Sequence, residues 1–196
     1  MNIINVTPDT AETTVQQLLK NREEACVYSI ADIPRAIVGN GGGSDEDAAR
    51  DLNMLVVHMG NEGGTIISNV GDVDVGLFTH GYYGDHIRDE LIRKIADEVK
   101  AKTGAEMTLD GNDHMIDGKK VIGHGSRMYD GMLYTAIHFS VYNSIGLIQK
   151  VCTKPMKKVP GALSDYGVTT EFVMQALDKV IKQQMEANDY AECESS

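Results

Sequence analysis

The segment "GNDHMIDGKKVIGHGSR" (residues 111–127) decides the fold assignment. Asp117 and Gly118 form the dipeptide that is typical of a two-residue β-hairpin turn, because both positions must adopt a positive φ angle. The flanking runs "DHMI" (113–116) and "KKVIGH" (119–124) are rich enough in β-branched residues to predict two paired strands. The segment therefore predicts an antiparallel hairpin.

The second strand of this hairpin begins with Lys119 and Lys120. Neighbouring side chains of a strand face opposite sides of the sheet, so one lysine is expected to face outward and the other inward. A lysine followed by Gly123 and Gly125 suits an anionic ligand whose oxygens approach the backbone closely. The alternative is a solvated pair of hairpin lysines without a binding role.

Outside the hairpin, runs of strands alternate with helices, which predicts an α+β domain with mixed, mostly antiparallel sheets. Periodic apolar residues predict helices near 9–21, 44–53, 85–103 and 169–185. The first is expected to begin with a capping box from Asp9 to Glu12 and the second with Ser44 as its N-cap, and Gly104 follows the end of the third. Further strands are predicted within 25–39, 55–58, 63–68, 72–78, 105–108 and 132–142, and a loop at 150–165. Residues 1–185 are expected to form one domain, followed by a polar, disordered tail at 186–196.

Composition narrows the function further. The net charge is -11, which would repel nucleic acid and anionic membrane surfaces. No apolar run is long enough to span a bilayer, and "MNIINVTPDT" (1–10) lacks the features of an export signal, so a cytoplasmic protein is expected. Cys26, Cys152 and Cys193 show no CxxC spacing, which indicates neither a disulfide framework nor a zinc site.

Three other motifs of functional sites lack support in the sequence. The stretch "GNGGGSDED" (39–47) contains glycines before a helix, but its three acidic residues would repel a phosphate, and they instead favour helix capping. The six histidines show no HExxH pattern, and no G-x-S-x-G elbow is present.

Taken together, these segments resemble the catalytic domain of the lipoate-protein ligase family, within the biotin/lipoate ligase and octanoyltransferase group. The hairpin segment is similar to the family's "N-D-h-x-h-D-G-K-K-h-x-G-x-A-x-R". The resemblance extends over most of residues 10–182. Three further blocks lie in the family's order: "AIVGN" (36–40), "LVVHMGNEGGTIISNVGD" (55–72) and "KKVPGALSDYGVTT" (157–170).

The resemblance implies that Lys120 is catalytic and holds the acyl carboxylate and the phosphate of an acyl-adenylate. It places Asn112 and Asp113 at the nucleotide, with Asp113 as a magnesium ligand, so ATP and Mg2+ are the implied cofactors. Gly123 and Arg127 are further possible site residues. The acyl and adenylate loop is implied to contain His58, Asn61, Gly63, Gly64 and Thr65.

The chain departs from the family pattern at several positions. His58 and Met59 replace an arginine pair, Glu62 replaces a glycine, and Ser68 replaces a histidine. The "H-G-T" start of the later strand reads "TAIH" at 135–138. These departures imply that activation of the acid is altered or is carried out by another protein, or that the enzyme activity is lost.

Three functions stay open on this basis. The first is ATP-dependent attachment of lipoic acid, octanoate or a related acyl group to a lysine of a lipoyl domain or a glycine-cleavage H-type carrier, with a separate accessory domain as a further possible partner. The second is an ATP-independent octanoyl or lipoyl transfer through Cys152, whose pKa Lys150 and Lys154 could lower. The third is a catalytically inactive homologue that binds acyl groups or proteins.

Docking of the carrier is expected to involve a basic cluster. Lys150, Lys154, Lys157 and Lys158 lie close together in the chain and could attract an acidic lipoyl domain. The alternative is an ordinary solvated loop.

Overall fold

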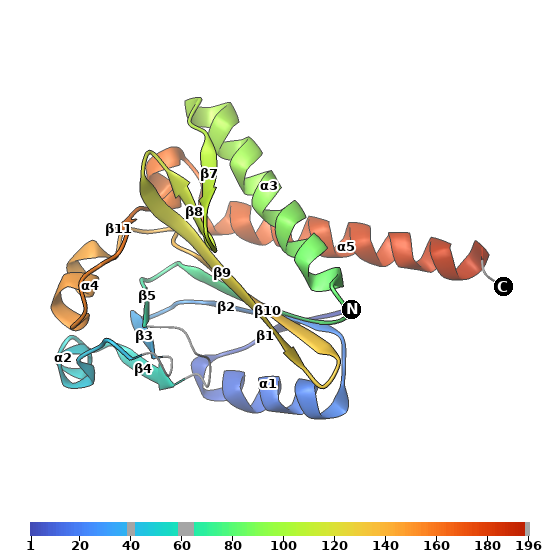
Figure 1. The fold of residues 1–196 in the computed structure, drawn as a ribbon, viewed down its shortest axis with the longest axis horizontal. Coiled ribbons are helices and arrows are strands. Elements are labelled where there is room, and N and C mark those ends of the chain that lie inside the picture. The colour runs from blue at the N-terminus through green and yellow to red at the C-terminus, as the bar shows by residue number, and fades with distance from the viewer. Residues whose placement is uncertain (39–41, 59–64, 195–196) are drawn as a thin grey trace.

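The computed structural model describes residues 1–38, 42–58 and 65–194 and confirms the α+β class. A large eight-stranded sheet has the order β1-β2-β6-β10-β9-β8-β7, with β11 paired to β9 (Figure 1). All its pairs are antiparallel except β1–β2 and β9–β11. Its strands are β1 (Asn2–Asn5), β2 (Ala25–Ile30), β6 (Val73–His80), β7 (Met107–Asp110), β8 (Asp113–Ile116), β9 (Lys119–Tyr129), β10 (Met132–Phe139) and β11 (Val159–Pro160).

A second, three-stranded sheet has the order β4-β3-β5. Its strands are β3 (Arg35–Val38), β4 (Leu55–His58) and β5 (Ile66–Ser68). Strand β3 pairs in parallel with β4 and antiparallel with β5. Two short helices, α2 (Glu46–Asp51) and α4 (Ile145–Val151), pack on the face of this sheet that points away from the large sheet. This packing buries Ala36, Ala49 and Val151.

Two long helices cover one face of the large sheet, called the back face here (Figure 1). They are α3 (Tyr83–Thr103) and α5 (Thr170–Glu194), and the 3-10 helix η1 (Leu163–Tyr166) lies beside α3. The back face supplies the odd-numbered residues of β6 and β10, including Val75, Leu77 and Ile137, to the main core. Full burial of a side chain of this size stabilises a fold by about 1.5–3 kcal/mol.

The opposite face of the large sheet, called the front face here, holds the even-numbered residues of β6 and β10. Helix α1 (Pro8–Asn21) covers one end of it, where Leu18 packs with Val27 and Phe78. The ring of Phe78 stacks on that of Tyr134 at a centroid distance of 4.8 Å. The three-stranded sheet lies on the same side as α1 (Figure 1).

Most predicted elements are confirmed, with shifts of a few residues. The N-cap of α1 is Thr7, which forms a capping box with Thr10, whereas the sequence predicted a capping box from Asp9 to Glu12, two residues whose side chains lie outside the described part of the chain. The N-cap of α2 is Asp45, whose carboxylate accepts from the Ala48 amide, and not Ser44. Helix α3 ends at Gly104 in the left-handed conformation, as predicted.

Two differences concern the C-terminal half of the chain. Helix α4 was not predicted, because it spans only two turns and contains Gly146. Helix α5 continues to Glu194, into the segment that the sequence predicts as a polar tail, while the single-domain assignment stays a prediction. In the part of the chain that the structure describes, no helix has the length and apolar character needed to cross a membrane.

Candidate functional site

The hairpin forms as predicted. Strands β8 and β9 are joined by Asp117 and Gly118, whose φ angles of 50° and 73° match the positive values that a two-residue turn requires. Lys119 is exposed, whereas the side chain of Lys120 is only 37% exposed. The expected division between an outward and an inward lysine is therefore observed.

A β-bulge sets the position of Lys120. Met115 pairs with Lys120, but the preceding residue His114 pairs with Ile122, so Val121 is an extra residue in β9. In a regular strand, positions 120 and 123 would face opposite sides. The bulge brings Lys120 to the same face as Gly123, where a Cβ atom on Gly123 would lie 3.0 Å from Lys120 Nζ.

The Lys120 ammonium belongs to an ion-pair cluster on the front face. Lys120 Nζ lies 2.7 Å from Asp113 Oδ1, and Lys158 Nζ lies 2.9 Å from Asp113 Oδ2 and 3.1 Å from Asp110 Oδ2. Burial would raise the pKa of Asp113, but the two lysines outweigh it and hold that pKa below its ordinary value. Asp113 thus stays ionised and joins the two cations.

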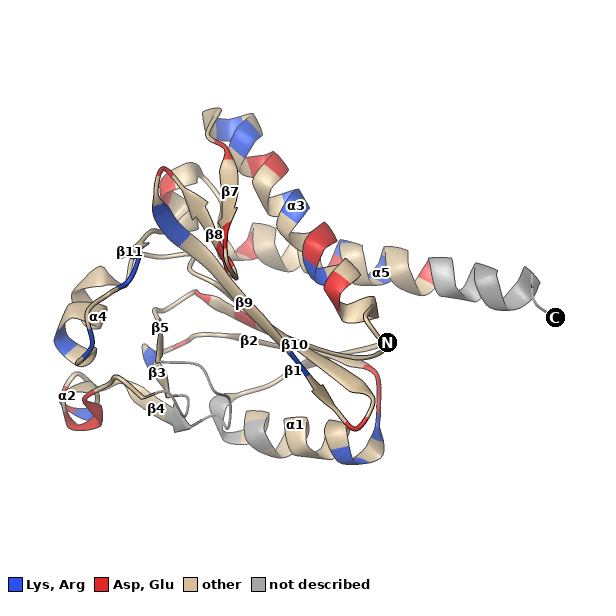
Figure 2. Ribbon diagram, in the orientation of Figure 1, with Lys and Arg blue, Asp and Glu red and all other residues tan. Residues whose placement is uncertain are grey.

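Strand β11 brings Lys158 into this cluster. Val159 and Pro160 pair in parallel with Lys119 and Lys120, and the Gly161 amide donates to the Lys120 carbonyl at 2.7 Å. Figure 2 shows basic residues at the start of β9 and near β11. The ammonium of Lys158 is therefore paired with Asp113 and its side chain is only 24% exposed, unlike the exposed lysines of the predicted basic cluster.

A row of polar residues extends from this cluster across the front face. Gly123 of β9 lies opposite His138 of β10, His138 lies opposite Asp74 of β6, and Asp74 lies opposite Ser29 of β2. His138 Nδ1 lies 2.8 Å from Asp74 Oδ1. Burial lowers the pKa of His138, but the nearby carboxylates of Asp74 and Asp72 prevail and raise it.

Arg35 links this row to the three-stranded sheet. Its Nη1 donates to Ser29 Oγ at 2.6 Å and its Nη2 to the Ile30 carbonyl at 2.7 Å. Arg35 is 4% exposed and lies opposite Ser68 of β5. The set of Gly123, His138, Asp74, Ser29, Arg35 and Ser68 is called the polar row below.

The other predicted residues are less closely grouped. Asn112 is exposed, and its carbonyl accepts from the His124 amide at 3.0 Å. Arg127 is exposed, with its guanidinium 5.2 Å from the ring centroid of Tyr129. Thr65 precedes β5 and is partly buried. The side chain of His58 and the residues Asn61, Gly63 and Gly64 lie outside the described part of the chain.

The predicted magnesium site at Asp113 does not fit the observed contacts. Each of its carboxylate oxygens already binds a lysine ammonium, so a metal ion would have to displace one of them. Among the residues that the structure describes, no group of three or more His, Cys, Asp and Glu side chains could hold a metal ion. The Asp113 carboxylate acts as a counter-ion for the lysines.

Cys152 occupies a different part of the molecule. It follows α4 and packs against the cluster of Ala36, Ala49 and Val151, on the face of β3 opposite Arg35. Burial raises the pKa of its thiol, whereas a nucleophile would need a lowered pKa. The expected lowering by Lys150 and Lys154 is not observed.

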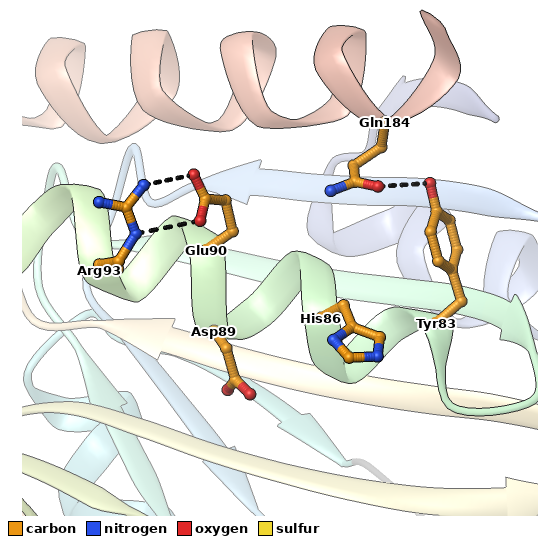
Figure 3. A pocket seen from close by; sticks show the side chains of 6 residues that line it. All are labelled: Tyr83, His86, Asp89, Glu90, Arg93 and Gln184. Atoms are coloured by element: carbon orange, nitrogen blue, oxygen red, sulfur yellow. Dashed lines mark hydrogen bonds and ion pairs between the residues drawn. The ribbon is translucent and has the colours of Figure 1, made fainter. Parts of the chain in front are cut away.

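A cavity of about 390 Å3 lies between α3 and α5, on the back of the molecule (Figure 3). It is lined by Tyr83, His86, Asp89, Glu90, Arg93 and Gln184. Several polar groups here already bind one another, since Arg93 Nη2 lies 2.7 Å from Glu90 and the Tyr83 hydroxyl donates to Gln184 at 3.1 Å. This cavity lies on the side of the large sheet away from Lys120.

The sequence interpretation missed the polar row. A signal for it was present, because Ser68 and His138 both lie at departures from the family pattern. The alternation in "DVDVGLF" (72–78) also places Asp74 on the face opposite Val73 and Val75. Only the strand pairing brings these residues together.

Comparisons with known proteins agree with this geometry at the level of the fold. No protein-family model and no curated protein matches the sequence. LipL1 of P. falciparum, solved in complex with lipoate, matches with a TM-score of 0.75 at 15% identity, over 95% of this chain and 62% of that chain. This chain therefore spans less than two thirds of LipL1.

Two further structures match over most of both chains. A bi-partite lipoate protein ligase from Thermoplasma acidophilum, solved as part of a lipoylation system with its E2 lipoyl domain, gives a TM-score of 0.70 at 14% identity, over 94% of this chain and 83% of that chain. Lipoate-protein ligase A bound with ATP gives 0.73 at 12% identity, over 94% and 85%. The chain has the fold of lipoate-protein ligases, which confirms the resemblance seen in the sequence at that level.

Proposed function

We propose that this chain is a lipoate-protein ligase-like enzyme that activates a medium-chain carboxylic acid with ATP and attaches it to a lysine of a carrier protein. The observation that carries the proposal is the Lys120 ammonium, held over Gly123 by the bulge in β9 and by Asp113. This arrangement lies within a fold shared with a ligase bound to ATP and with LipL1 bound to lipoate.

The chemistry has two steps. A carboxylate oxygen of the acid attacks the α-phosphorus of ATP, a bond to that phosphorus forms, and pyrophosphate leaves with its electron pair. The carrier's lysine amine then attacks the acyl carbon, and AMP leaves as the amide forms. In both steps negative charge develops on oxygens beside the reacting centre, where a fixed ammonium contributes a few kcal/mol of stabilisation.

The ammonium of Lys158 adds to the positive electrostatic potential at the same site. Both lysines share Asp113, so an incoming anion can replace one carboxylate contact while the other lysine keeps Asp113 in place. This gives the site two cations although the family's arginine pair is replaced by His58 and Met59. The missing arginines are therefore compatible with activity.

The proposed partner is an acidic lipoyl-type carrier. Lys150, Lys154 and Lys157 are exposed and remain as candidates for the docking surface, whereas Lys158 binds Asp113. A separate accessory subunit is also proposed, because one structure with this fold belongs to a bi-partite ligase.

Pyrophosphate release by the purified protein with ATP, Mg2+ and lipoate tests the proposal. Release that depends on the acid supports activation. Acyl transfer from a thioester without ATP would replace the proposal by a transferase, and the Cys152→Ser variant would then lose that transfer. No turnover in either assay, with acyl binding retained, would indicate the inactive homologue.

A further inference from the structure

The start of strand β9 is held by a segment other than β10. The pairing of β10 with β9 ends at Phe139 and Ile122, and residues 119 and 120 pair with β11 instead. Pro160 of β11 has no amide proton, and the next residue, Gly161, donates its amide to the Lys120 carbonyl at 2.7 Å. The segment 158–161 is called the strap below.

The strap meets β9 at its β-bulge. In a regular strand the carbonyls of neighbouring residues point to opposite edges. At the bulge, however, the carbonyls of Lys120 and Val121 both accept from groups outside β8, which are the amides of Gly161 at 2.7 Å and of Ser140 at 2.9 Å. A carbonyl that a bulge turns out of the ladder needs such a donor. The Gly161 amide therefore stabilises the backbone conformation that brings Lys120 to the face of Gly123.

Gly161 also packs closely on the bulge. A Cβ atom built on Gly161 would lie 2.8 Å from Lys119 Cβ and 3.0 Å from Val121 Cγ1. Lys119 Cβ is bonded to the backbone, so it cannot turn away as the end of a side chain can. The φ angle of Gly161 lies outside the left-handed region, so lack of space, and not backbone conformation, requires glycine here.

The strap is fixed on both sides of Gly161. Before it, Lys158 Nζ lies 2.9 Å from Asp113 Oδ2. After it, Leu163 is fully buried and its amide donates to the Ser140 carbonyl at 2.9 Å. A side chain at position 161 must therefore push the strap and β9 apart between two fixed points, which weakens the hydrogen bond that joins them.

We infer that Gly161 is a positioning residue for Lys120. Its amide and its lack of a side chain hold the bulge in β9, and the bulge keeps the Lys120 ammonium over Gly123 and against Asp113. This inference rests on the proposed function and deepens it, because it names the main-chain group that orients the lysine of that reaction.

Competitive acetylation with a trace of acetic anhydride, followed by mass spectrometry, tests the inference without turnover. The Lys120 ammonium is paired with Asp113 and should react more slowly than Lys179, an exposed reference lysine of α5. In Gly161→Ala, the rate at Lys120 relative to Lys179 should rise about two- to fivefold, the range expected for loss of a partly exposed ion pair. Gly146→Ala, whose new Cβ meets no atom within 4 Å, is the matched control and should leave the ratio unchanged.

Two further variants separate positioning from general stability. Val180→Ala removes fully buried atoms from the core on the back face, so it should lower the melting temperature and leave the Lys120 ratio unchanged. Adding Lys119→Gly to Gly161→Ala removes the atom that lies 2.8 Å from the new Cβ and should lower the ratio again. If the ratio stays raised in this double variant, the close approach of Gly161 is not the cause and the inference is wrong.

Amide hydrogen exchange of the parent protein gives a test that needs no variant. The Gly161 amide is buried and hydrogen-bonded, so it should exchange as slowly as the core amides of β10. Exchange at the rate of an exposed loop would show that the strap does not hold Lys120, and would overturn the inference.

The outcomes separate the inference from the proposed function. If Gly161→Ala keeps the parent ratio, or Val180→Ala raises it equally, the inference is wrong even when the parent protein activates lipoate. If the parent releases no pyrophosphate but Gly161→Ala raises the ratio, the proposed function fails while Gly161 still positions Lys120. In an active parent, Gly161→Ala should lower pyrophosphate release about tenfold or more, because a small displacement of a group at the reacting centre slows the reaction strongly. An unchanged rate with a raised ratio would overturn the positioning role.

Discussion

Lys120 Nζ lies 2.7 Å from Asp113 Oδ1, and the pair is joined across a β-bulge on adjacent strands. The position of this ammonium therefore depends on the pairing of the two strands as well as on the packing of its side chain. Its neighbour Lys119 is exposed and offers a matched comparison.

The first prediction concerns these two lysines. Lys120→Ala should lower the rate of acid-dependent pyrophosphate release at least about 100-fold, a loss typical for removal of one group that stabilises transition-state charge. Lys119→Ala should change the rate less than about threefold, because its side chain faces solvent. Equal losses in the two variants would show that general surface charge, and not the placed ammonium, supports the reaction.

The second prediction concerns Gly123. In Gly123→Ala the new Cβ would lie 3.0 Å from Lys120 Nζ and 3.4 Å from Asp113 Oδ1, so the flexible end of Lys120 must move. We expect a loss of about tenfold in pyrophosphate release with little change in melting temperature, because only a side-chain end is displaced.

Two controls accompany that variant. Gly146→Ala in α4 has no atom within 4 Å of the new Cβ and should leave the rate unchanged. Adding Gly123→Ala to Lys120→Ala should cause no further loss, since both act through the same ammonium. If the losses of the two single variants add in the double variant, the substitution at Gly123 does not act through the Lys120 ammonium.

The hairpin shows what the sequence could and could not supply. Asp117-Gly118 determines the turn, and the bounds of β8 are predicted to the residue, because the turn chemistry is local. The bulge at Val121 is not visible in the sequence, since it depends on which residues of β8 and β9 face each other. The inward lysine was expected, but its contact with Gly123 was not.

The same limit applies to Lys158 and the polar row. Lys158 is separated from Asp113 by more than forty positions, and a local cluster of lysines predicts only a basic loop. Its pairing follows from β11 lying beside β9. Arg35, Asp74 and Ser68 come from three strands in two sheets, so no spacing along the chain connects them.

The third prediction concerns acid stability at Asp113. The pKa of Asp113 lies below its ordinary value in the folded state, so this group stabilises the fold above its ordinary pKa and the contribution is lost as the pH falls through the folded value. Lys158→Met removes one of its two cations and raises that folded value. We expect acid unfolding, followed by circular dichroism, to move to higher pH, whereas exposed Lys157→Met should not shift it.

The fourth prediction concerns Cys152. Its thiol is partly buried and burial raises its pKa, so it should react slowly with iodoacetamide at pH 7. Cys152→Ser should leave ATP-dependent pyrophosphate release unchanged. ATP-independent acyl transfer from a thioester that is present in the parent protein and lost in Cys152→Ser, at an unchanged melting temperature, would restore the transferase hypothesis.

The fifth prediction concerns a histidine pair at the edge of the back face. The rings of His114 and His124 lie 5.3 Å apart, beside Arg88 and Asp89 of α3. Burial, together with the charges of His124 and Arg88, lowers the pKa of His114 from 6.5 to about 4. Between these two values the unfolded chain binds a proton that the folded chain refuses, so stability must fall as the pH is lowered through that window.

His114→Gln removes one of the two histidines, His114 and His124, whose lowered pKa values cause this loss of stability. The free energy of unfolding from urea titrations at pH 7 and pH 5 should therefore decrease less in this variant than in the parent protein. His86→Gln, at an exposed position of α3, provides the comparison and should keep the parent's decrease. If His114→Gln also keeps the full decrease, the protons bind to His124 or to groups outside this pair, and the lowered pKa of His114 has no part in the acid sensitivity of the fold.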